Sequence, residues 1–408
     1  MKSNEKKTLE KASSLVRILQ KFRFLSVFKY CFLYLDKLIL FFFVKKPKKT
    51  SDKKQVLITP NLGVGDAIQF LTTVEKYREA YPKDEYEITF MCRQSVIDIF
   101  KNEADFEHFE VINIDEGMFN LKKRIENIKK INEKYYDIYI DPIGPFSCSM
   151  NVFLSASSYA KEKVTILNKS MCIVPKSILK KAYTKIYEID EENYPMIKHY
   201  NKLIDCILNN EDNEKIDFHR TKEYKIEEEL PEEYYIIFPS SKLEKKKWPV
   251  ERYKELAQKI YDRTKITLLI TGTKEDEETI SELTKDLNVD YYVLKSKLNI
   301  MQFIQIIKNA KFVISNDTGA YHIAVSENVP VTIITGGYAF NRYVIYDFES
   351  NQEYRKPYIV SANKECFNCN DNCKYYKNLQ DKYPCLMEIT VEDAWRKVEK
   401  MIDDIKCK

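Results

Sequence analysis

Short apolar runs alternate with amphipathic stretches along most of this chain. The first series of apolar runs covers residues 56–59, 86–92, 110–114 and 136–140. The second series covers residues 234–238, 266–271, 291–294, 312–315 and 331–335. The stretches between the runs have helical periodicity, for example at residues 67–81, 121–133, 250–261, 275–287 and 301–309. Strands that alternate with helices of about 10 to 15 residues predict parallel sheets covered by helices on both faces.

The two series predict two domains. A chain of 408 residues is too long for one compact core, and a charged stretch around Pro231 interrupts the alternation. We therefore expect an α/β protein with two Rossmann-like, doubly wound domains that face a cleft. The expected segments are a basic amphipathic extension (1–54), an N-terminal domain (55–210), a linker (211–233), a C-terminal domain (234–365) and a cysteine-bearing tail with a C-terminal helix (366–408).

The positive charge of the chain is concentrated at its N-terminus. Residues 1–54 contain 15 Lys/Arg and 4 Asp/Glu, a net +11, whereas the whole chain carries +4, so the remainder carries −7. A nucleic-acid-binding protein would need a basic face on its folded part. The mildly acidic remainder therefore argues against nucleic acid as a partner.

The basic extension predicts a helix at a membrane surface. Residues 15–44 are rich in Leu, Phe, Tyr and Ile, but charged residues interrupt them before any apolar run reaches the ~20 residues that a membrane-spanning helix needs. The apolar side chains would enter an anionic lipid surface. Four lysines would contact the headgroups at roughly 1 kcal/mol each: Lys45, Lys46, Lys48 and Lys49. The alternative is an amphipathic helix packed on the folded body.

Ten cysteines are present, and six of them are scattered singly, as in proteins of a reducing compartment. No signal-peptide cleavage pattern follows the first apolar piece of the extension. We therefore expect a cytoplasmic protein that is peripheral on the inner face of the cytoplasmic membrane. The other four cysteines are grouped near the C-terminus: Cys366, Cys369, Cys373 and Cys385. Their spacing suits a tetrahedral structural zinc site, and it is also compatible with reduced thiols or with disulfides.

Glycine is scarce in this chain, so its positions are informative. Only 8 of the 408 residues are glycine, well below the roughly 7% of ordinary proteins. Six of the eight follow predicted strands: Gly63, Gly65, Gly272, Gly319, Gly336 and Gly337. Ligand sites of α/β proteins form at tight turns after strands. The glycines therefore mark a candidate site in each half of the chain.

The most distinctive motif is Asp317-Thr318-Gly319 followed by His322, directly after the apolar run 312–315. The helix expected at residues 320–327 would present backbone N–H groups at its start to a phosphate. A carboxylate, a hydroxyl and an imidazole beside that helix start predict an anion pocket. His322 could instead be a histidine of the core.

The turn after the first strand contains Gly63, Gly65 and Asp66. It differs from a dinucleotide-binding turn because Ile68 replaces the third glycine, and because the second strand ends at Arg93 without an acidic residue. Both differences argue against a dehydrogenase. Asp66 at a helix start is a candidate catalytic carboxylate, and the alternative is an ordinary helix N-cap.

A run of lysines follows the first strand of the second series. Ser240 and Ser241 come first, then residues 242–247 with four lysines, then Trp248. Lysine ammonium groups neutralise phosphate as compact charges. The alternative is a solvated lysine run, but a tryptophan beside it favours a loop that is held on the protein.

Taken in order, these motifs resemble those of glycosyltransferase family 9, the heptosyltransferase-like enzymes of the GT-B fold. The resemblance extends from about residue 55 to residue 398. It implies that Asp66 is the general base and that the second domain binds a nucleotide-sugar diphosphate, with an ADP-heptose-like donor as one candidate. The implied donor-binding residues are Ser240, Ser241, Lys246, Gly272, Asp317, Thr318, Gly319 and His322. The implied acceptor-side residues are Gly63, Gly65 and Asp141.

The resulting functional hypothesis is an inverting, metal-independent glycosyltransferase. It would move a sugar such as heptose to a lipopolysaccharide-type or other surface-glycan acceptor, and its catalysis would need no cofactor. No Asp-x-Asp triplet for a metal-bridged diphosphate occurs in the chain. Two alternatives are a nucleotide-sugar epimerase of GT-B build and a non-catalytic membrane-surface scaffold. The nucleobase, the acceptor and the oligomeric state are not specified by the sequence.

Overall fold

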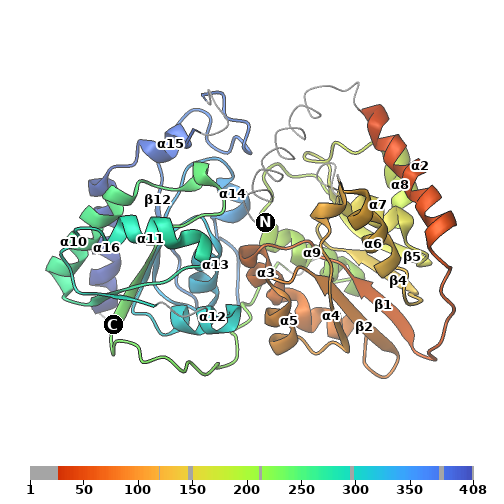
Figure 1. Cartoon of the computed structure of the whole chain (residues 1–408), viewed down its shortest axis with the longest axis horizontal. Coiled ribbons are helices and arrows are strands. Elements are labelled where there is room, and N and C mark those ends of the chain that lie inside the picture. The colour runs from red at the N-terminus through yellow and green to blue at the C-terminus, as the bar shows by residue number, and fades with distance from the viewer. Residues whose placement is uncertain are drawn as a thin grey trace. The chain divides into compact units, whose positions relative to one another are not determined.

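The computed structural model describes residues 26–118, 120–145, 150–210, 214–294, 298–375 and 381–406, which form two compact units (Figure 1). The first unit consists of the chain up to Leu62 together with Thr73–Tyr194 and His199–Asp212. The second unit consists of Gly63–Thr72, Pro195–Lys198 and the chain from Asn213 onwards.

The first unit is built on a six-stranded parallel sheet with the strand order β3-β2-β1-β4-β5-β6. Its strands are β1 (Lys54–Ile58), β2 (Tyr86–Cys92), β3 (His108–Val111), β4 (Ile138–Asp141), β5 (Glu162–Asn168) and β6 (Lys185–Ile189). Val56 of the central strand β1 pairs with Ile88 on one side and Ile138 on the other. Helices cover both faces, and β1 is therefore fully buried from Val56 to Ile58.

The helices of the first unit are mostly short. They are α4 (Val74–Ala80), α5 (Ile97–Glu103), α6 (Leu121–Lys130), α7 (Met150–Ser157), α8 (Lys176–Ala182) and α9 (Met196–Leu208, whose first residues belong to the second unit), with the 3₁₀ turns η2 (Leu71–Thr73) and η3 (Asp115–Met118).

Helix α2 (Ser26–Phe43) packs on the first unit against α6 and α7. Leu33 and Ile39 are buried, and the buried carboxylate of Asp36 forms an ion pair with the buried guanidinium of Arg124. The helix therefore packs on the body, as in the second of the two alternatives for the extension. Its outer face nevertheless remains apolar: Tyr34, Leu38, Phe41, Phe42 and Phe43 are exposed. No helix in the described part of the chain is long and apolar enough to cross a membrane.

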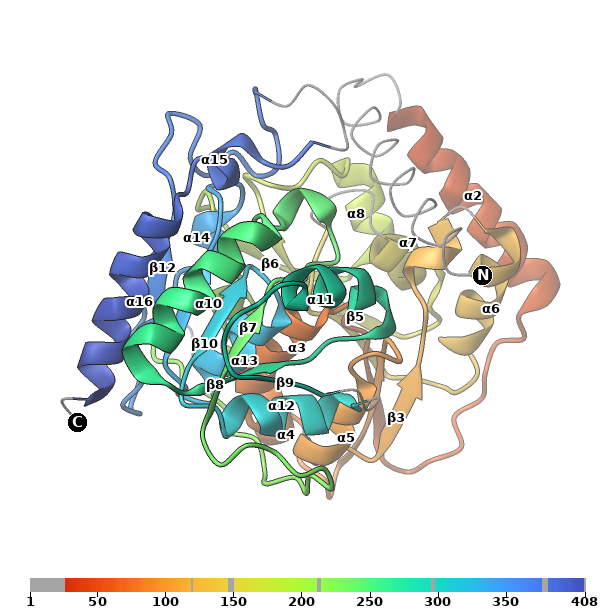
Figure 2. The same cartoon turned by 60° about the vertical axis from the view of Figure 1, so that its left-hand side comes forward.

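The second unit has the same architecture, with the strand order β12-β11-β10-β7-β8-β9. Its strands are β7 (Tyr234–Phe238), β8 (Thr267–Ile270), β9 (Tyr291–Val293), β10 (Val313–Asn316), β11 (Val331–Ile334) and β12 (Tyr358–Val360). Its helices are α3 (Val64–Phe70), α10 (Val250–Thr264), α11 (Glu277–Thr284), α12 (Ile300–Lys308), α13 (Gly319–Ser326), α14 (Phe340–Tyr343), α15 (Pro384–Met387) and α16 (Val391–Lys406), with the 3₁₀ turns η4 (Glu244–Lys246) and η5 (Lys274–Asp276). The C-terminal helix α16 lies beside α10 (Figure 2).

Both sheets are parallel and doubly wound, so the predicted fold class is confirmed. The grouping of segments differs from the expected boundaries in two respects. Helix α3, expected in the first domain, is grouped with the second unit because it packs against α13. The described part of the expected linker, residues 214–233, has no regular element and lies on the second unit, where Phe218 is buried against three aromatic rings: Tyr346, Phe348 and Tyr354.

Candidate functional site

The end of strand β10 anchors a polar site in the second unit. The buried side chain of Asn316, the last residue of β10, accepts hydrogen bonds from the Trp248 backbone N–H (3.2 Å) and the Tyr253 hydroxyl (2.9 Å). Its amide nitrogen donates to the carbonyl oxygen of Pro239 (2.5 Å). Because β7 and β10 are neighbours, these bonds hold the loop after β7 beside the loop after β10. The two motifs predicted to bind phosphate therefore lie together.

Asp317 is the centre of this site. Its carboxylate lies 2.8 Å from the Lys246 ammonium nitrogen and 3.9 Å from Nε2 of His322, and it accepts a hydrogen bond from Tyr338. Burial alone would raise the pKa of Asp317, but Lys246 and His322 outweigh it and hold that pKa below its usual value. Burial alone would lower the pKa of Lys246, but the carboxylates of Asp317 and Asp371 raise it. The pair is thus ionised at neutral pH.

His322 is buried on α13, and its ring nitrogen Nδ1 has two possible hydrogen-bond partners. Nδ1 lies 2.6 Å from the Tyr346 hydroxyl and 3.3 Å from the side-chain nitrogen of Gln69. Burial lowers the pKa of His322 below its usual value, although the carboxylates of Asp317 and Asp66 act in the opposite direction. The ring is therefore neutral at neutral pH, with Nε2 directed towards Asp317.

Two glycines allow α3 to approach α13 closely. A Cβ atom on Gly65 would lie 2.3 Å from Cδ2 of His322, and a Cβ atom on Gly319 would lie 2.8 Å from Cγ1 of Val64. Neither distance is compatible with a side chain in this backbone arrangement. The approach brings Asp66 into the same unit as Asp317 and His322. Asp66 is half-buried, and its carboxylate accepts a hydrogen bond from the backbone N–H of Gly63 (3.2 Å).

The three consecutive lysines after β7 have different partners. Lys246 pairs with Asp317, whereas Lys245 lies 3.3 Å from Asp371 and Lys247 lies 2.8 Å from Glu244. The lysine run is therefore held on the protein.

The remaining predicted donor residues lie on the loops after β7, β8 and β10. Ser240 is buried, and the half-buried Ser241 hydroxyl accepts from the backbone N–H of Leu243 (3.4 Å). The Thr318 hydroxyl lies 3.1 Å from that of Ser315. A Cβ on Gly272 would lie 2.9 Å from Cβ of Asp276, so this glycine also permits a tight turn.

Asp141, predicted on the acceptor side, lies at the end of β4 in the first unit and is fully buried. It accepts from the Tyr183 hydroxyl (2.6 Å), the Asn151 amide (2.9 Å) and the backbone of the following turn. Burial raises its pKa, and these hydrogen bonds only partly offset the effect. The observed contacts hold the turn after β4. An acceptor-side role for Asp141 stays a prediction.

The structure also reveals site residues that the motifs did not predict. Gln69 and Tyr346 contact His322, and Tyr338 contacts Asp317. Of these three, only Tyr338 has a local signal, the Gly336-Gly337 pair that precedes it. In the first unit, the ends of three neighbouring strands carry a polar cluster. Arg93 donates to Asn61 (2.7 Å) and forms an ion pair with Asp115.

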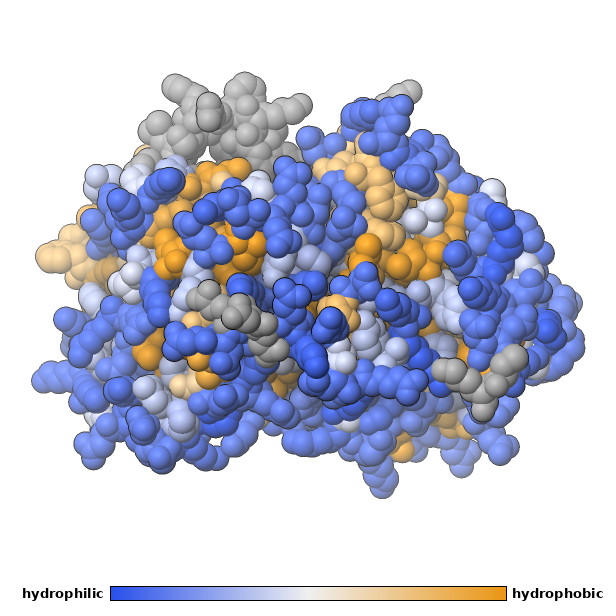
Figure 3. All heavy atoms as spheres, turned by 180° about the vertical axis from the view of Figure 1, so that it is seen from behind, coloured by the Kyte–Doolittle hydropathy of each residue, from blue (hydrophilic) through white to orange (hydrophobic). Residues whose placement is uncertain are grey.

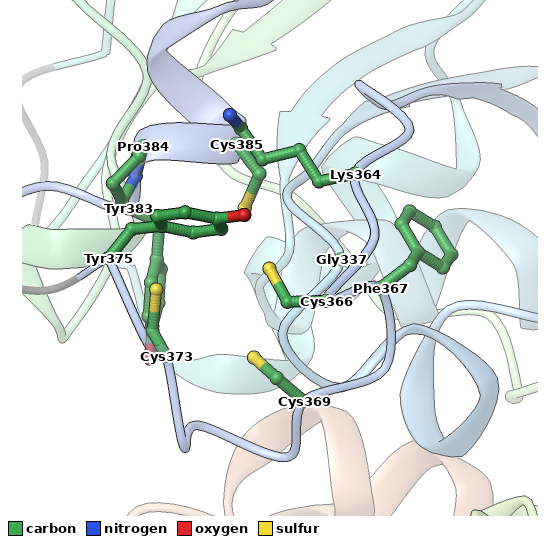
Figure 4. Close-up of a pocket in the computed structure, with 10 residues that line it drawn as sticks. All are labelled: Gly337, Lys364, Cys366, Phe367, Cys369, Cys373, Tyr375, Tyr383, Pro384 and Cys385. Carbon is green, nitrogen blue, oxygen red and sulfur yellow. The ribbon is translucent and has the colours of Figure 1, made fainter.

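The four grouped cysteines are free thiols that line one cavity in the second unit (Figure 4). Among the residues that the structure describes, no three side chains of His, Cys, Asp or Glu converge closely enough to hold a metal ion as they stand. The predicted zinc site is therefore not preformed.

Comparison with known proteins shows a match to glycosyltransferase family 9 (heptosyltransferase) over residues 124–336. Lipopolysaccharide heptosyltransferase 2 of Escherichia coli (strain K12) is 28% identical over 95 residues, which are 22% of this chain and only 27% of that relative. In fold, the chain is similar to E. coli ADP-heptose lps heptosyltransferase II, with a TM-score of 0.62, 15% identity and coverage of 86% of this chain and 99% of that one. It is also similar to a family 9 glycosyltransferase from Veillonella parvula DSM 2008, with a TM-score of 0.66, 16% identity and coverage of 87% and 99%.

Proposed function

Since the chain belongs to glycosyltransferase family 9, the heptosyltransferase family, we propose that it moves a heptose or similar sugar from a nucleotide diphosphate to a lipopolysaccharide-type or other surface-glycan acceptor. The transfer inverts the anomeric centre and uses no metal. The observation that carries this proposal is the grouping of Lys246, Asp317 and the start of α13 with Asp66 in one unit. A cation, helix-start N–H groups and a carboxylate are the groups that this reaction needs.

The donor diphosphate binds at Lys246 and the start of α13. Lys246 keeps its charge because Asp317 and Asp371 raise its pKa, and the first N–H groups of a helix point outwards without partners in the helix. Negative charge grows on the diphosphate as the sugar leaves. Groups placed beforehand around that charge stabilise the transition state more than the ground state.

Asp66 acts as the general base. It accepts the proton of the acceptor hydroxyl while that oxygen attacks the anomeric carbon from the face opposite the diphosphate, which inverts the centre in one displacement. Base catalysis of this kind contributes roughly 10²- to 10⁴-fold. The hydrogen bond from the Gly63 N–H fixes the carboxylate at the start of α3.

In this proposal the first unit contacts the membrane and contributes to acceptor binding. The half-buried cluster of Arg93, Asn61 and Asp115 in the first unit offers polar groups to a glycan. The other acceptor-side residues of the proposal are Gly63, Gly65 and Asp141. The outer face of α2 and the lysines after it hold the enzyme on the inner face of the cytoplasmic membrane. Figure 3 shows hydrophobic surface at the upper left, on the side of the first unit that carries α2.

Thermal unfolding with a panel of ADP-, GDP-, UDP- and CMP-linked sugars tests the donor site. One of these donors should stabilise the wild type, by about 2.7 kcal/mol at a hundred times its dissociation constant. Lys246→Ala should lose most of the shift. Lys247→Ala is the matched control and should keep it, because Lys247 pairs with Glu244 instead. An equal shift in all three proteins would contradict the assignment of Lys246.

Product analysis then separates the two enzyme hypotheses. A transferase releases the nucleoside diphosphate and a glycosylated acceptor, whereas an epimerase releases an isomer of its own nucleotide sugar. If no donor in the panel shifts the unfolding temperature, the scaffold hypothesis gains support. Addition of EDTA during the assay should leave turnover unchanged, and loss of activity that Mn²⁺ restores would contradict metal-independent transfer.

A further inference from the structure

A pocket in the first unit lies between α2 and its neighbours α7 and α8 (Figure 1). It contains about 430 Å³ of space, part of which is open to solvent. Sites for small molecules usually measure roughly 300–1,000 Å³. The proposed sugar transfer uses none of the residues that line this pocket, so the pocket requires an explanation of its own.

The pocket combines apolar walls with two lysines. Leu33, Leu40 and Ala156 supply apolar surface. Lys37 of α2 and Lys181 of α8 also line the pocket, and both residues are exposed. Two ammonium groups from different helices therefore border one partly apolar pocket.

The acidic residue of the pocket, Asp36, has its charge matched within the protein. Its carboxylate accepts a hydrogen bond from Nη2 of Arg124 (2.7 Å), and both side chains are buried. The rings of Phe32 and Phe153 lie 4.6 Å and 5.1 Å from the same guanidinium. Because Asp36 is neutralised by Arg124, the two lysines leave the pocket with a net positive charge.

A buried hydroxyl of the pocket lacks a hydrogen-bond partner. Ser157, the last residue of α7, lines the pocket and is only 1% exposed. Among the residues that the structure describes, none forms a hydrogen bond with its Oγ. A buried polar group without a partner costs free energy. An oxygen of a bound ligand would supply the missing acceptor.

We propose that this pocket binds the phosphate headgroup of one anionic phospholipid. Lysine ammonium groups neutralise phosphate as compact charges, so Lys37 and Lys181 hold the phosphate. The Ser157 hydroxyl donates a hydrogen bond to a phosphate oxygen. The apolar walls cover the glycerol carbons and the first carbons of the acyl chains. The chains then leave the pocket towards the membrane that the outer face of α2 contacts.

Charge favours this occupant over the N-terminal segment of the chain. Residues 1–25, which are outside the described part of the chain, contain 7 Lys/Arg and 2 Asp/Glu. A basic segment does not complement a pocket with two lysines, whereas an anionic headgroup does. The lipid site goes beyond the membrane contact proposed for α2, because it binds a single lipid and saturates. It rests on that contact only for access to lipid.

Binding of a soluble, short-chain lipid is the first test. Dihexanoyl phosphatidylglycerol is titrated calorimetrically into the full chain below the concentration at which the lipid forms micelles. We expect saturation at one lipid per chain. Dihexanoyl phosphatidylcholine, which has no net charge, and inorganic phosphate, which has no carbons for the apolar walls, should bind at least about tenfold more weakly. No saturable binding, or equal affinity for either comparison compound, would overturn the proposal.

Two pairs of lysines provide a matched comparison. The double variant Lys37→Gln, Lys181→Gln should bind the short-chain lipid at least about tenfold more weakly than the wild type, since each lysine contributes roughly 1 kcal/mol. The double variant Lys176→Gln, Lys180→Gln should bind like the wild type, because these exposed lysines of α8 do not line the pocket. Both variants lose two charges. Equal affinity of the two variants would therefore overturn the assignment of the site.

Ser157→Ala separates lipid binding from a role in the fold. Loss of a buried hydroxyl that has no partner should leave the unfolding temperature without lipid unchanged or raise it. Affinity for the short-chain lipid should nevertheless fall. Unchanged affinity, or a clearly lower unfolding temperature without lipid, would contradict the contact between Ser157 and the phosphate.

The variant Phe41→Ser, Phe42→Ser separates the lipid site from the membrane contact of α2. It should still bind one short-chain lipid per chain, because neither residue lines the pocket. If the wild type binds the short-chain lipid but no vesicles containing anionic lipid, the pocket stands and the membrane contact fails. If it binds vesicles but shows no saturable binding of the short-chain lipid, the membrane contact stands and the lipid site is wrong.

Discussion

At the scale of single residues, burial and contacts distinguish the two carboxylates of the candidate site. Asp317 is buried in an ion pair with Lys246, and Asp66 is half-buried at a helix start. The sequence motifs predicted both residues, because each follows a strand end beside a glycine. The partners Gln69, Tyr338 and Tyr346 were not predicted from sequence. Gln69 lies 253 residues before His322, and Tyr346 lies 24 residues after it. The glycine pair before Tyr338 marks a turn, but no local pattern indicates which residues these three side chains contact.

Replacing Asp66 with asparagine should separate catalysis from binding. The amide oxygen can still accept from the Gly63 N–H, so α3 should start as before. The amide cannot take up a proton, so turnover should fall roughly 10²- to 10⁴-fold. The dissociation constant of the donor should stay close to that of the wild type. Steady-state turnover and donor titration measure the two quantities, and near-normal turnover would rule out Asp66 as the base.

His322 predicts a specific pH dependence of stability. Its folded-state pKa lies below 6.5, so the unfolded chain takes up the proton first as the pH falls. The contribution of the neutral ring is therefore complete above about pH 6.5 and is lost as the pH falls from 6.5 through the folded-state value. The charged groups that face the ring are Asp317, Asp66 and Lys246.

Urea unfolding of wild type and His322→Gln at pH 8, 6 and 5 measures this dependence. The stability difference between the two proteins should shrink or reverse towards pH 5. The other three histidines of the chain are present in both proteins and cancel in the difference. A difference that is constant across the three pH values would show that His322 titrates alike in the folded and unfolded states.

At the scale of elements, most strands were predictable, including the edge strands β3 and β9, whereas β5, β6 and β12 were not among the predicted apolar runs. β1, β7 and β10 are continuous apolar runs because helices cover both sides of them. β6 is partly exposed and β12 has only three residues, so neither gives a clear apolar run. The placement of α3 was also unpredictable, because it depends on contacts between residues that are far apart in the sequence. Gly65 lies against His322, and Gly319 lies against Val64.

The contact between α3 and α13 can be tested with a pair of glycine substitutions. Gly65→Ala places a methyl group 2.3 Å from the His322 ring, so we expect about 1–3 kcal/mol of destabilisation and a weaker donor shift. Gly63→Ala should be much milder, because the nearest atom to its new methyl group is a carboxylate oxygen of Asp66 at 3.3 Å. Thermal unfolding with and without donor compares the two. If the two variants are equally stable and show equal donor shifts, the close approach of α3 to α13 is contradicted.

At the scale of the whole molecule, the two-domain α/β plan followed from the alternation of runs, whereas the attachment of the N-terminal extension did not. The ion pair of Asp36 and Arg124 holds α2 on the body, and no pattern in the sequence indicates that these two residues meet. Deleting residues 1–49 would therefore remove the partner of Arg124 and uncover the surface of α6 and α7 on which α2 packs, so the deletion would also change the stability of the first unit. Substitutions on the exposed face of α2 are a cleaner test of membrane binding.

The double variant Phe41→Ser, Phe42→Ser should bind vesicles containing anionic lipid at least about tenfold more weakly than the wild type. Burial of one large apolar side chain contributes about 1.5–3 kcal/mol, and 1.4 kcal/mol corresponds to a factor of about ten. The control is Tyr291→Ser, Tyr292→Ser, which removes two exposed aromatic rings from the second unit. Vesicle sedimentation measures both, and equal binding of all three proteins would exclude α2 as the membrane contact.

The close contact of α3 and α13 also has a consequence for synthesis of the chain on the ribosome. Gln69 leaves the ribosome 253 residues before His322, the residue it contacts. At about 5–20 residues per second, the wait is roughly 10–50 s. Throughout that time α3, which carries the proposed base Asp66, lacks the helix α13 on which it packs in the folded protein. A nascent chain stalled before residue 319 should therefore be cleaved by protease within residues 63–72, and that cleavage should stop once α13 has emerged.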